Sequence, residues 1–197
     1  MNAMNRKRTQ LVLDIGGVLA TNLSPVFWHK LAEASGMAVE SFYADYKRRI
    51  SKELWTGQIT EPAFWQWLLL QLPSLDDGQA KQYLSESLTA LPAMEKLAGW
   101  SERADIHILS NHVAEWVNPL LEPVRHHLGT VTLSSEIGMK KPSADIYAYV
   151  NGQLPQEAPI VFVDDQDINL RQAERHGWQT LLADEDGHWI NKIAALL

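Results

Sequence analysis

Five short hydrophobic runs divide the chain, and most of them end in a polar or acidic residue. These runs are Leu11–Leu13, Ile106–Leu109, Val131–Leu133, Ile160–Val163 and Thr180–Ala183. Runs of this length, flanked by polar residues, are typical of buried parallel strands. Between the later runs lie segments long enough for helices, at 93–102, 113–127, 143–153 and 169–176. The alternation predicts an α/β fold with a Rossmann-like parallel sheet and helices on both of its faces.

The alternation stops between Pro25 and Leu88, where no strand pattern occurs. Apolar residues recur there at helical spacing, as in Phe64, Trp67 and Leu68. Pro62 and the Asp76-Asp77-Gly78 segment are typical of helix starts. We therefore predict a small all-helical cap, residues 23–88, inserted after the first strand and lying above the ends of the sheet. Residues 1–22 and 89–197 would form the α/β core domain.

The composition excludes several classes of protein. Of 197 residues, 46% are hydrophobic and 21% charged, as in ordinary globular proteins. The net charge of -7 argues against a nucleic-acid partner, which would favour a basic surface. The chain has no cysteine, no signal-peptide pattern and no apolar run long enough to span a membrane. We expect a cytoplasmic protein without a membrane partner, and either a monomer or a homodimer.

Polar residues follow the strands at the edge of the sheet where ligands bind. In open parallel sheets that edge is formed by the carboxyl ends of the strands. Asp14, Ser110, Ser134 and the pair Asp164-Asp165 stand there, and Lys141 comes shortly after Ser134. A single acid at a strand end is usually structural, but an ordered set of such residues points to a shared site.

This ordered set resembles the motifs of the haloacid dehalogenase (HAD) superfamily. The segment LVLDIGGVL is similar to the first motif and ILSN to the second. GMKKP resembles the third, which supplies a lysine, and VFVDDQDIN resembles the fourth, an acidic pair followed by Asn. These four segments span nearly the whole chain. The form of the first and third motifs is most similar to sugar-phosphate phosphatases, including those that act on glucose 1-phosphate.

The resemblance implies a hydrolase that takes phosphate from a small metabolite through a covalent intermediate on Asp14. It implies Mg²⁺ as cofactor, bound by Asp14, by the Gly16 carbonyl and by Asp165, with Asp164 acting directly or through water. Lys141 and the Ser110 hydroxyl would complete the catalytic set. Ser110, Lys141, Gly17 and the backbone of Asn111 would bind the substrate.

Elementary electrostatics agrees with these roles. A carboxylate can attack phosphorus, but it must approach an anion. Two unit charges about 4 Å apart interact by about 4 kcal/mol at an effective dielectric near 20. A hard cation such as Mg²⁺ and a fixed lysine are the usual means of offsetting that repulsion. Phosphoryl transfer depends mainly on such positioning and charge neutralisation.

Gly16 departs from the pattern, because most phosphatases of the superfamily carry a second Asp there as general acid and base. That proton transfer typically contributes roughly 10²- to 10⁴-fold. The substrate could have a good leaving group, as in an anomeric or acyl phosphate, or His112 could replace the acid. Alternatively, the protein is a non-catalytic binder of phosphometabolites, or a carbon–halogen hydrolase, in which halide needs no acid. The dehalogenase interpretation leaves the pair Asp164-Asp165 without a purpose.

Several residues near the motifs have simpler interpretations. We expect Lys140 at the surface, Asp167 as a helix cap, and Asn169 as a helix-start residue or one that orients Asp165. Ser134 and Ser135 are expected to be structural. In the cap, the basic segment 47–55 ends in Trp55, on which a sugar could stack, and Arg48 could meet a second anion. A solvated helix face with a core tryptophan is the simpler interpretation of this segment.

Overall fold

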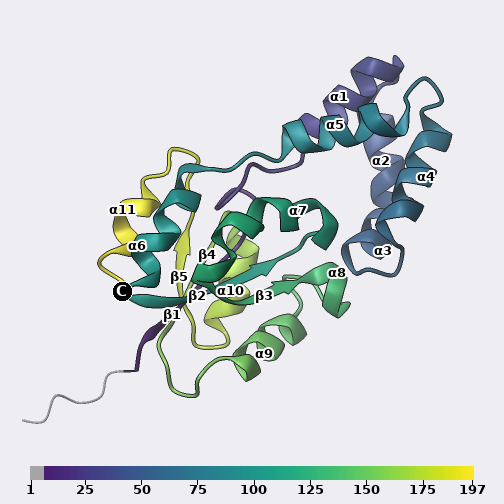
Figure 1. Ribbon diagram of the computed structural model, residues 1–197. Helices are drawn as coiled ribbons and strands as arrows, with labels where there is room; N and C mark the ends of the chain where they lie inside the picture. Colours follow the sequence, from purple (N-terminus) through teal and green to yellow (C-terminus); the bar gives the residue numbers. More distant parts are fainter. Residues whose placement is uncertain (1–6) are drawn as a thin grey trace, which may run out of the picture.

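The computed structural model describes residues 7–197 and contains the predicted parallel sheet (Figure 1). Its strands are β1 (Thr9–Leu13), β2 (Ala104–Ser110), β3 (Leu128–Leu133), β4 (Ile160–Asp164) and β5 (Gln179–Leu182). They lie in the order β3-β2-β1-β4-β5, and every neighbouring pair is parallel. The bounds differ from the predicted ones by a few residues at most. Because β1 is central, the chain that leaves it emerges in the middle of the sheet edge.

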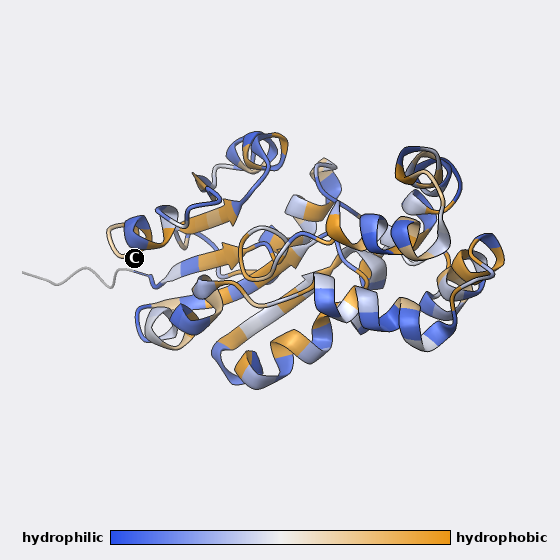
Figure 2. Ribbon diagram, turned by 90° about the horizontal axis from the view of Figure 1, so that it is seen from above, coloured by the Kyte–Doolittle hydropathy of each residue, from blue (hydrophilic) through white to orange (hydrophobic). Residues whose placement is uncertain are grey.

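Side chains alternate between the two faces of each strand, and each face has its own helical layer. Leu11 and Leu13 of β1 pack into one buried cluster, whereas Val12 packs into another. The first cluster is completed by α6 (Leu97–Ser101), α7 (Ala114–Leu121) and α11 (Trp189–Ile193). The second is completed by α9 (Ala144–Gln153) and α10 (Asp167–Glu174). The α/β architecture with helices on both faces is therefore confirmed, and Figure 2 shows the hydrophobic strands between these layers.

Two of the predicted helices consist of a 3₁₀ helix and an α-helix in succession. Segment 113–127 forms α7 and then a 3₁₀ helix, η2 (Glu122–His127). Pro123 has no amide hydrogen with which to continue the α-helical hydrogen bonds, so the chain tightens there. Segment 93–102 likewise begins as a 3₁₀ helix, η1 (Pro92–Lys96), before α6.

The first five of the helices between β1 and β2 lie together at one end of the sheet (Figure 1). They are α1 (Val26–Ser35), α2 (Val39–Arg49), α3 (Ser51–Trp55), α4 (Glu61–Gln71) and α5 (Asp77–Ser87). Thr60 caps α4, with Pro62 in its first turn, and Asp76 forms a capping box with Gln79 at the start of α5. The region between β1 and β2 is thus helical, as expected. The division into domains at 22/23 and 88/89 stays a prediction.

The helical group contacts the rest of the chain at the start of α7 and at α8. Val113 and Trp116, at the start of α7, are buried in the hydrophobic cluster of helices α1–α5. The turn after α3 meets α8 (Ser134–Ile137), which follows β3. The carboxyl edge of the sheet is therefore covered by α3 and its turn. Within residues 7–197, no helix is both long and apolar enough to cross a bilayer.

Candidate active site

Three strands end at one cavity of about 300 Å³. Asp14 directly follows β1, Ser110 is the last residue of β2, and Asp164 is the last residue of β4. Asp14, Ser110, Asp165 and Lys141 all line the cavity, whereas Asp164 is completely buried behind it. The structure thus brings together residues that are up to 151 positions apart in the sequence.

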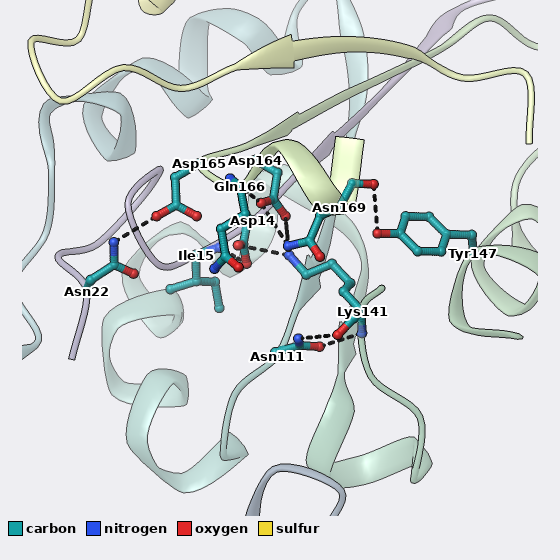
Figure 3. Close-up of polar contacts among 10 residues, drawn as sticks. All are labelled: Asp14, Ile15, Asn22, Asn111, Lys141, Tyr147, Asp164, Asp165, Gln166 and Asn169. Atoms are coloured by element: carbon teal, nitrogen blue, oxygen red, sulfur yellow. Dashed lines mark hydrogen bonds and ion pairs between the residues drawn. The ribbon is translucent and has the colours of Figure 1, made fainter. Parts of the chain in front are cut away.

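Lys141 is the electrostatic centre of this site (Figure 3). Its Nζ lies 2.8 Å from Oδ2 of Asp14 and 2.5 Å from Oδ2 of Asp164. The lysine side chain is 1% exposed, so the ion pairs are shielded from water. Removing charges from water is costly, and a buried cation between two carboxylates is the arrangement that offsets the cost.

Burial and charge act on the Asp14 carboxyl in opposite directions. Burial raises the pKa of Asp14 to about 7, Lys141 opposes this rise, and the neighbouring Asp164 adds to it. Hydrogen bonds from Lys141 and from the Ser110 hydroxyl also favour the carboxylate. For Lys141, burial disfavours the charged amine, but Asp14 and Asp164 outweigh burial and raise its pKa. Asp14 is consequently a desolvated carboxyl group at the carboxyl end of β1.

The Asp164 carboxylate is fixed from every side. Asn169 donates from Nδ2 to Oδ1 at 2.9 Å and to Oδ2 at 3.1 Å. The Gln166 amide donates to Oδ1 at 2.8 Å, and the Tyr147 hydroxyl donates to the Asn169 carbonyl at 2.9 Å. Of the two roles expected for Asn169, its place at the start of α10 is confirmed, whereas the expected orientation of Asp165 is wrong, because Asn169 binds Asp164. The first acid of the pair points inward to Asn169 and the second points into the cavity.

Asp165 retains coordinating capacity. Its Oδ2 accepts a hydrogen bond of 2.8 Å from Nδ2 of Asn22. Its Oδ1 is buried and has no hydrogen-bond partner among residues 7–197. One carboxylate oxygen each from Asp14, Asp164 and Asp165 lie within 4.8 Å of one another. An orphaned oxygen beside two further carboxylates fits a hard, oxygen-ligated cation such as Mg²⁺.

The two glycines after Asp14 allow this close approach. A Cβ on Gly16 would lie 2.7 Å from Oδ1 of Asn22. Gly17 has a φ of +68°, and a Cβ there would lie 2.5 Å from Oδ2 of Asp165. The Gly17 amide donates to the Ala20 carbonyl at 2.8 Å, and Gly17 lines a neighbouring cavity. This geometry does not support the predicted role of Gly17 in substrate binding. It indicates that Gly17 is needed because a side chain there would collide with Asp165.

Asn111 holds the backbone of Lys141 through its side chain. Its Oδ1 accepts from the Lys141 amide at 2.8 Å, and its Nδ2 donates to the Lys141 carbonyl at 2.9 Å. Asn111 also lines the cavity. The loop after β2 therefore fixes the loop that carries the lysine.

His112 and Trp55 form the wall of the cavity nearest the helical group. Their rings are nearly perpendicular, with centroids 5.3 Å apart. His112 is 4% exposed, and its Nδ1 has no partner in the part of the chain that the structure describes. Burial lowers the pKa of His112 to about 4, and the Lys141 cation contributes to the lowering. The imidazole is therefore neutral near pH 7.

The remaining predicted residues lie away from the cavity. Asp167 is the first residue of α10, its side chain makes no capping hydrogen bond and Gln166 is the N-cap, so the predicted cap is wrong. The Ser135 hydroxyl accepts from the Ala114 amide, consistent with a structural role. Lys140 is half-buried and absent from the cavity lining. Arg48 is exposed and paired with Asp45.

Two residues of the site could not be predicted from the sequence. Asn22 lies in the loop before α1 and Tyr147 lies in α9, and neither belongs to a strand end or to one of the four motifs. Polar residues in loops and helices are common, so nothing in their local sequence marks them. Only the fold brings them to the acidic pair.

No protein-family model matches the chain, and no curated protein matches it. Solved structures do. A HAD family enzyme from Bacteroides thetaiotaomicron is 20% identical, with a TM-score of 0.83 over 94% of this chain and 98% of that one. The same enzyme has also been solved with magnesium and inorganic phosphate.

Two further solved structures are similar. A predicted HAD-like family hydrolase from Porphyromonas gingivalis is 21% identical, with a TM-score of 0.77 over 98% of both chains. A dehalogenase is 20% identical, with a TM-score of 0.65 over 100% of this chain and 99% of that one. The chain therefore has the fold of the HAD enzymes.

Proposed function

We propose that this chain, having the HAD fold, is a Mg²⁺-dependent hydrolase of that superfamily, a phosphatase that acts on a small phosphorylated metabolite such as a sugar phosphate. One observation carries the proposal. The Lys141 amine bridges Asp14 and Asp164 at 2.8 and 2.5 Å, beside the unpartnered Oδ1 of Asp165. A buried nucleophile, a fixed cation and spare oxygen ligands are what phosphoryl transfer to a carboxylate requires.

In the first step, a carboxylate oxygen of Asp14 attacks phosphorus. A bond forms between that oxygen and phosphorus, and the bond from phosphorus to the leaving oxygen breaks. In the second step, water attacks the aspartyl-phosphate, Asp14 regains its carboxylate and inorganic phosphate departs. The leaving oxygen gains the proton that water loses in the overall reaction, so atoms and charge balance.

The chain's own residues hold the reacting groups in place. Lys141 places a positive charge at the nucleophile, and the Ser110 hydroxyl hydrogen-bonds to the same carboxyl group. Asn111 fixes the lysine loop, so the charge is preorganised before the substrate arrives. Asp14, the Gly16 carbonyl, Asp165 and Asp164 would hold Mg²⁺. When bound, the ion would neutralise charge on the phosphate.

The lowered pKa of His112 bears on the missing general acid. With a pKa of about 4, only about one imidazole in a thousand is protonated at pH 7. His112 is therefore a poor proton donor, and Gly16 has no side chain to offer. We infer that substrates with good leaving groups are preferred, because their leaving oxygen departs without help from an acid.

A dehalogenase is the second candidate function, favoured by the missing acid at Gly16 and by the likeness to a dehalogenase of known structure. Halide departs without a proton, and that chemistry needs no metal. The unpartnered Asp165 oxygen would then be left without a role, so we rank this candidate below the phosphatase.

The proposal is tested by a screen of phosphorylated metabolites with Mg²⁺, in which released inorganic phosphate is measured. Asp14→Asn, which keeps the shape of the side chain, should abolish release, and so should a chelator. Phosphate release by Asp14→Asn would contradict the nucleophile. Halide release from 2-chloropropionate without metal would favour the dehalogenase, and tight binding of a phosphorylated ligand without turnover would favour a binding protein.

A further inference from the structure

The cavity at the carboxyl edge of the sheet has little positive charge with which to bind an anionic substrate. Among the described residues that line it, Lys141 is the only one with a cationic side chain. That side chain is already paired with Asp14 and Asp164. One lysine and one Mg²⁺ would together balance the three carboxylates, which leaves only hydrogen-bond donors for the transferred phosphate.

Apart from Lys141 and the carboxylates, the lining of the cavity is neutral and partly apolar. Trp55, Leu23 and the uncharged His112 belong to it, and Asn22, Ser24 and Gln166 are among its neutral polar members. A volume of about 300 Å³ is at the small end of the range for ligand pockets. A leaving group in this cavity meets the rings of Trp55 and His112 and several neutral hydrogen-bonding side chains.

The basic segment of the helical group lies elsewhere. Arg48 and Arg49 are both paired with Asp45, and their side chains are 71% and 59% exposed. None of the four cations between Lys47 and Lys52 lines the cavity. A second anion on the substrate would therefore enter this cavity without a counter-charge, which is unfavourable in a partly desolvated site.

We propose, on the premise of the phosphatase function above, that the site takes phosphate monoesters with a small, uncharged, hydroxyl-bearing leaving group and discriminates against leaving groups that carry a second anion. The neutral wall of Trp55 and His112 is the structural basis of this selectivity. The predicted contact between Arg48 and a second anion does not occur in this arrangement.

A matched pair of compounds tests the proposal in the full-length protein with Mg²⁺. Glycerol 3-phosphate and 3-phosphoglycerate differ in one terminal group, a hydroxymethyl in the first and a carboxylate in the second. We expect kcat/KM to be at least about tenfold higher for glycerol 3-phosphate. If neither compound is turned over, their inhibition constants against 4-nitrophenyl phosphate provide the same comparison.

The outcomes separate this inference from the proposed function. Equal or better use of 3-phosphoglycerate, or equal or tighter binding of it, overturns the selectivity and leaves the phosphatase intact. Failure to hydrolyse even 4-nitrophenyl phosphate overturns the phosphatase, and the selectivity that rests on it falls as well.

Adding a positive charge to the cavity by substitution is a second, independent test of the selectivity. Gln166 is exposed and lines the cavity, so Gln166→Arg adds a cation at its rim. This variant should reduce the preference for glycerol 3-phosphate severalfold, as judged by the ratio of the two kcat/KM values or inhibition constants. Gln153→Arg adds the same charge at an exposed position outside the cavity lining and should leave the ratio unchanged. An unchanged ratio in Gln166→Arg would contradict the proposal.

Discussion

Asn22 donates a hydrogen bond of 2.8 Å to Asp165, although 143 positions separate the two residues. The same Asn22 side chain places its Oδ1 2.7 Å from where a Cβ of Gly16 would be. Asn22 thus fills the space beside Gly16 and fixes the second acid of the pair. The position of the Asn22 side chain therefore explains both why glycine fits at position 16 and how Asp165 is oriented.

Removing the Asn22 amide should weaken metal binding. In Asn22→Ala, Asp165 loses the hydrogen bond that orients its carboxylate, and partners of ligating carboxylates typically matter by tenfold or more. We expect the Kd for Mg²⁺ to rise roughly tenfold by isothermal titration calorimetry. Asn191→Ala, at an exposed position on α11, is the matched control. An unchanged Kd for Mg²⁺ in Asn22→Ala would show that Asp165 is positioned without Asn22.

Gly16→Ala should act through Asn22. The added methyl group would displace the Asn22 side chain, so the variant should raise the Kd for Mg²⁺ in the wild-type background. In the Asn22→Ala background the methyl group has room, and the second substitution should add little. Such non-additivity is what a double-mutant cycle detects for residues in contact. Gly99→Ala, where a Cβ meets nothing within 4 Å, controls for the general effect of the substitution. Strict additivity would mean that Gly16 and Asn22 act independently.

Lys141→Met should destabilise the protein as well as inactivate it. The substitution keeps much of the side-chain length but leaves Asp14 and Asp164 buried together without their cation. Breaking a buried charge network in this way costs about 3–5 kcal/mol. Urea denaturation in the absence of metal should show that loss in the free energy of unfolding. Adding Asp14→Asn, which removes one of the two unpaired carboxylates, should restore part of it. If Lys141→Met alone were as stable as the wild type, the network of Lys141, Asp14 and Asp164 would contribute nothing to the stability of the fold.

Much of the site could be predicted because parallel strands impose it. Asp14, Ser110 and Asp164 stand at the ends of adjacent strands, and those ends necessarily meet. Lys141 could be predicted from the third motif. The fold was predictable for a related reason, since strand and helix patterns alternate everywhere outside the helical insertion.

What could not be predicted depends on side-chain direction and on solvation. The sequence predicts Asn169 beside Asp165, but Asn169 binds Asp164, because the backbone at the end of β4 decides which of two adjacent acids faces inward. Asn22 reaches the site from a loop, and Tyr147 reaches it from a helix. The pKa of His112 depends on burial against Trp55 and Trp116, which no local pattern contains.

His112 should make the protein sensitive to mild acid. Burial lowers its pKa from 6.5 to about 4 in the folded state. The unfolded chain therefore binds more protons between these values, and stability is lost as the pH falls from about 6.5 towards 4. His112→Asn should remove up to about 3 kcal/mol of that loss, as measured by urea denaturation at pH 7.5 and 4.5. His126→Asn, at an exposed position, should leave the pH dependence as in the wild type. If His112→Asn also leaves it unchanged, the imidazole is not desolvated in solution.

Gly57, in the turn after α3, lies close against the backbone of α8. A Cβ at this position would lie 1.9 Å from the backbone oxygen of Ser135, a contact that flexible side chains cannot relieve. Its φ of +66° adds strain for any other residue. Gly57→Ala should therefore lift the turn after α3 from α8 and shift Trp55 away from His112.

Because Trp55 lines the cavity but has no part in the network of Asp14, Lys141 and Asp164, lifting the turn should impair substrate binding more than chemistry. We expect Gly57→Ala to raise KM for 4-nitrophenyl phosphate severalfold with a smaller change in kcat. Gly36→Ala is a matched control, because Gly36 has a φ of +70° but no atom within 4 Å of where the added methyl group would be. That control carries the backbone strain alone, about 1 kcal/mol in the free energy of unfolding, and should keep the wild-type KM. Equal KM values for the two variants would mean that the contact between Gly57 and Ser135 does not hold the wall of the active site in place.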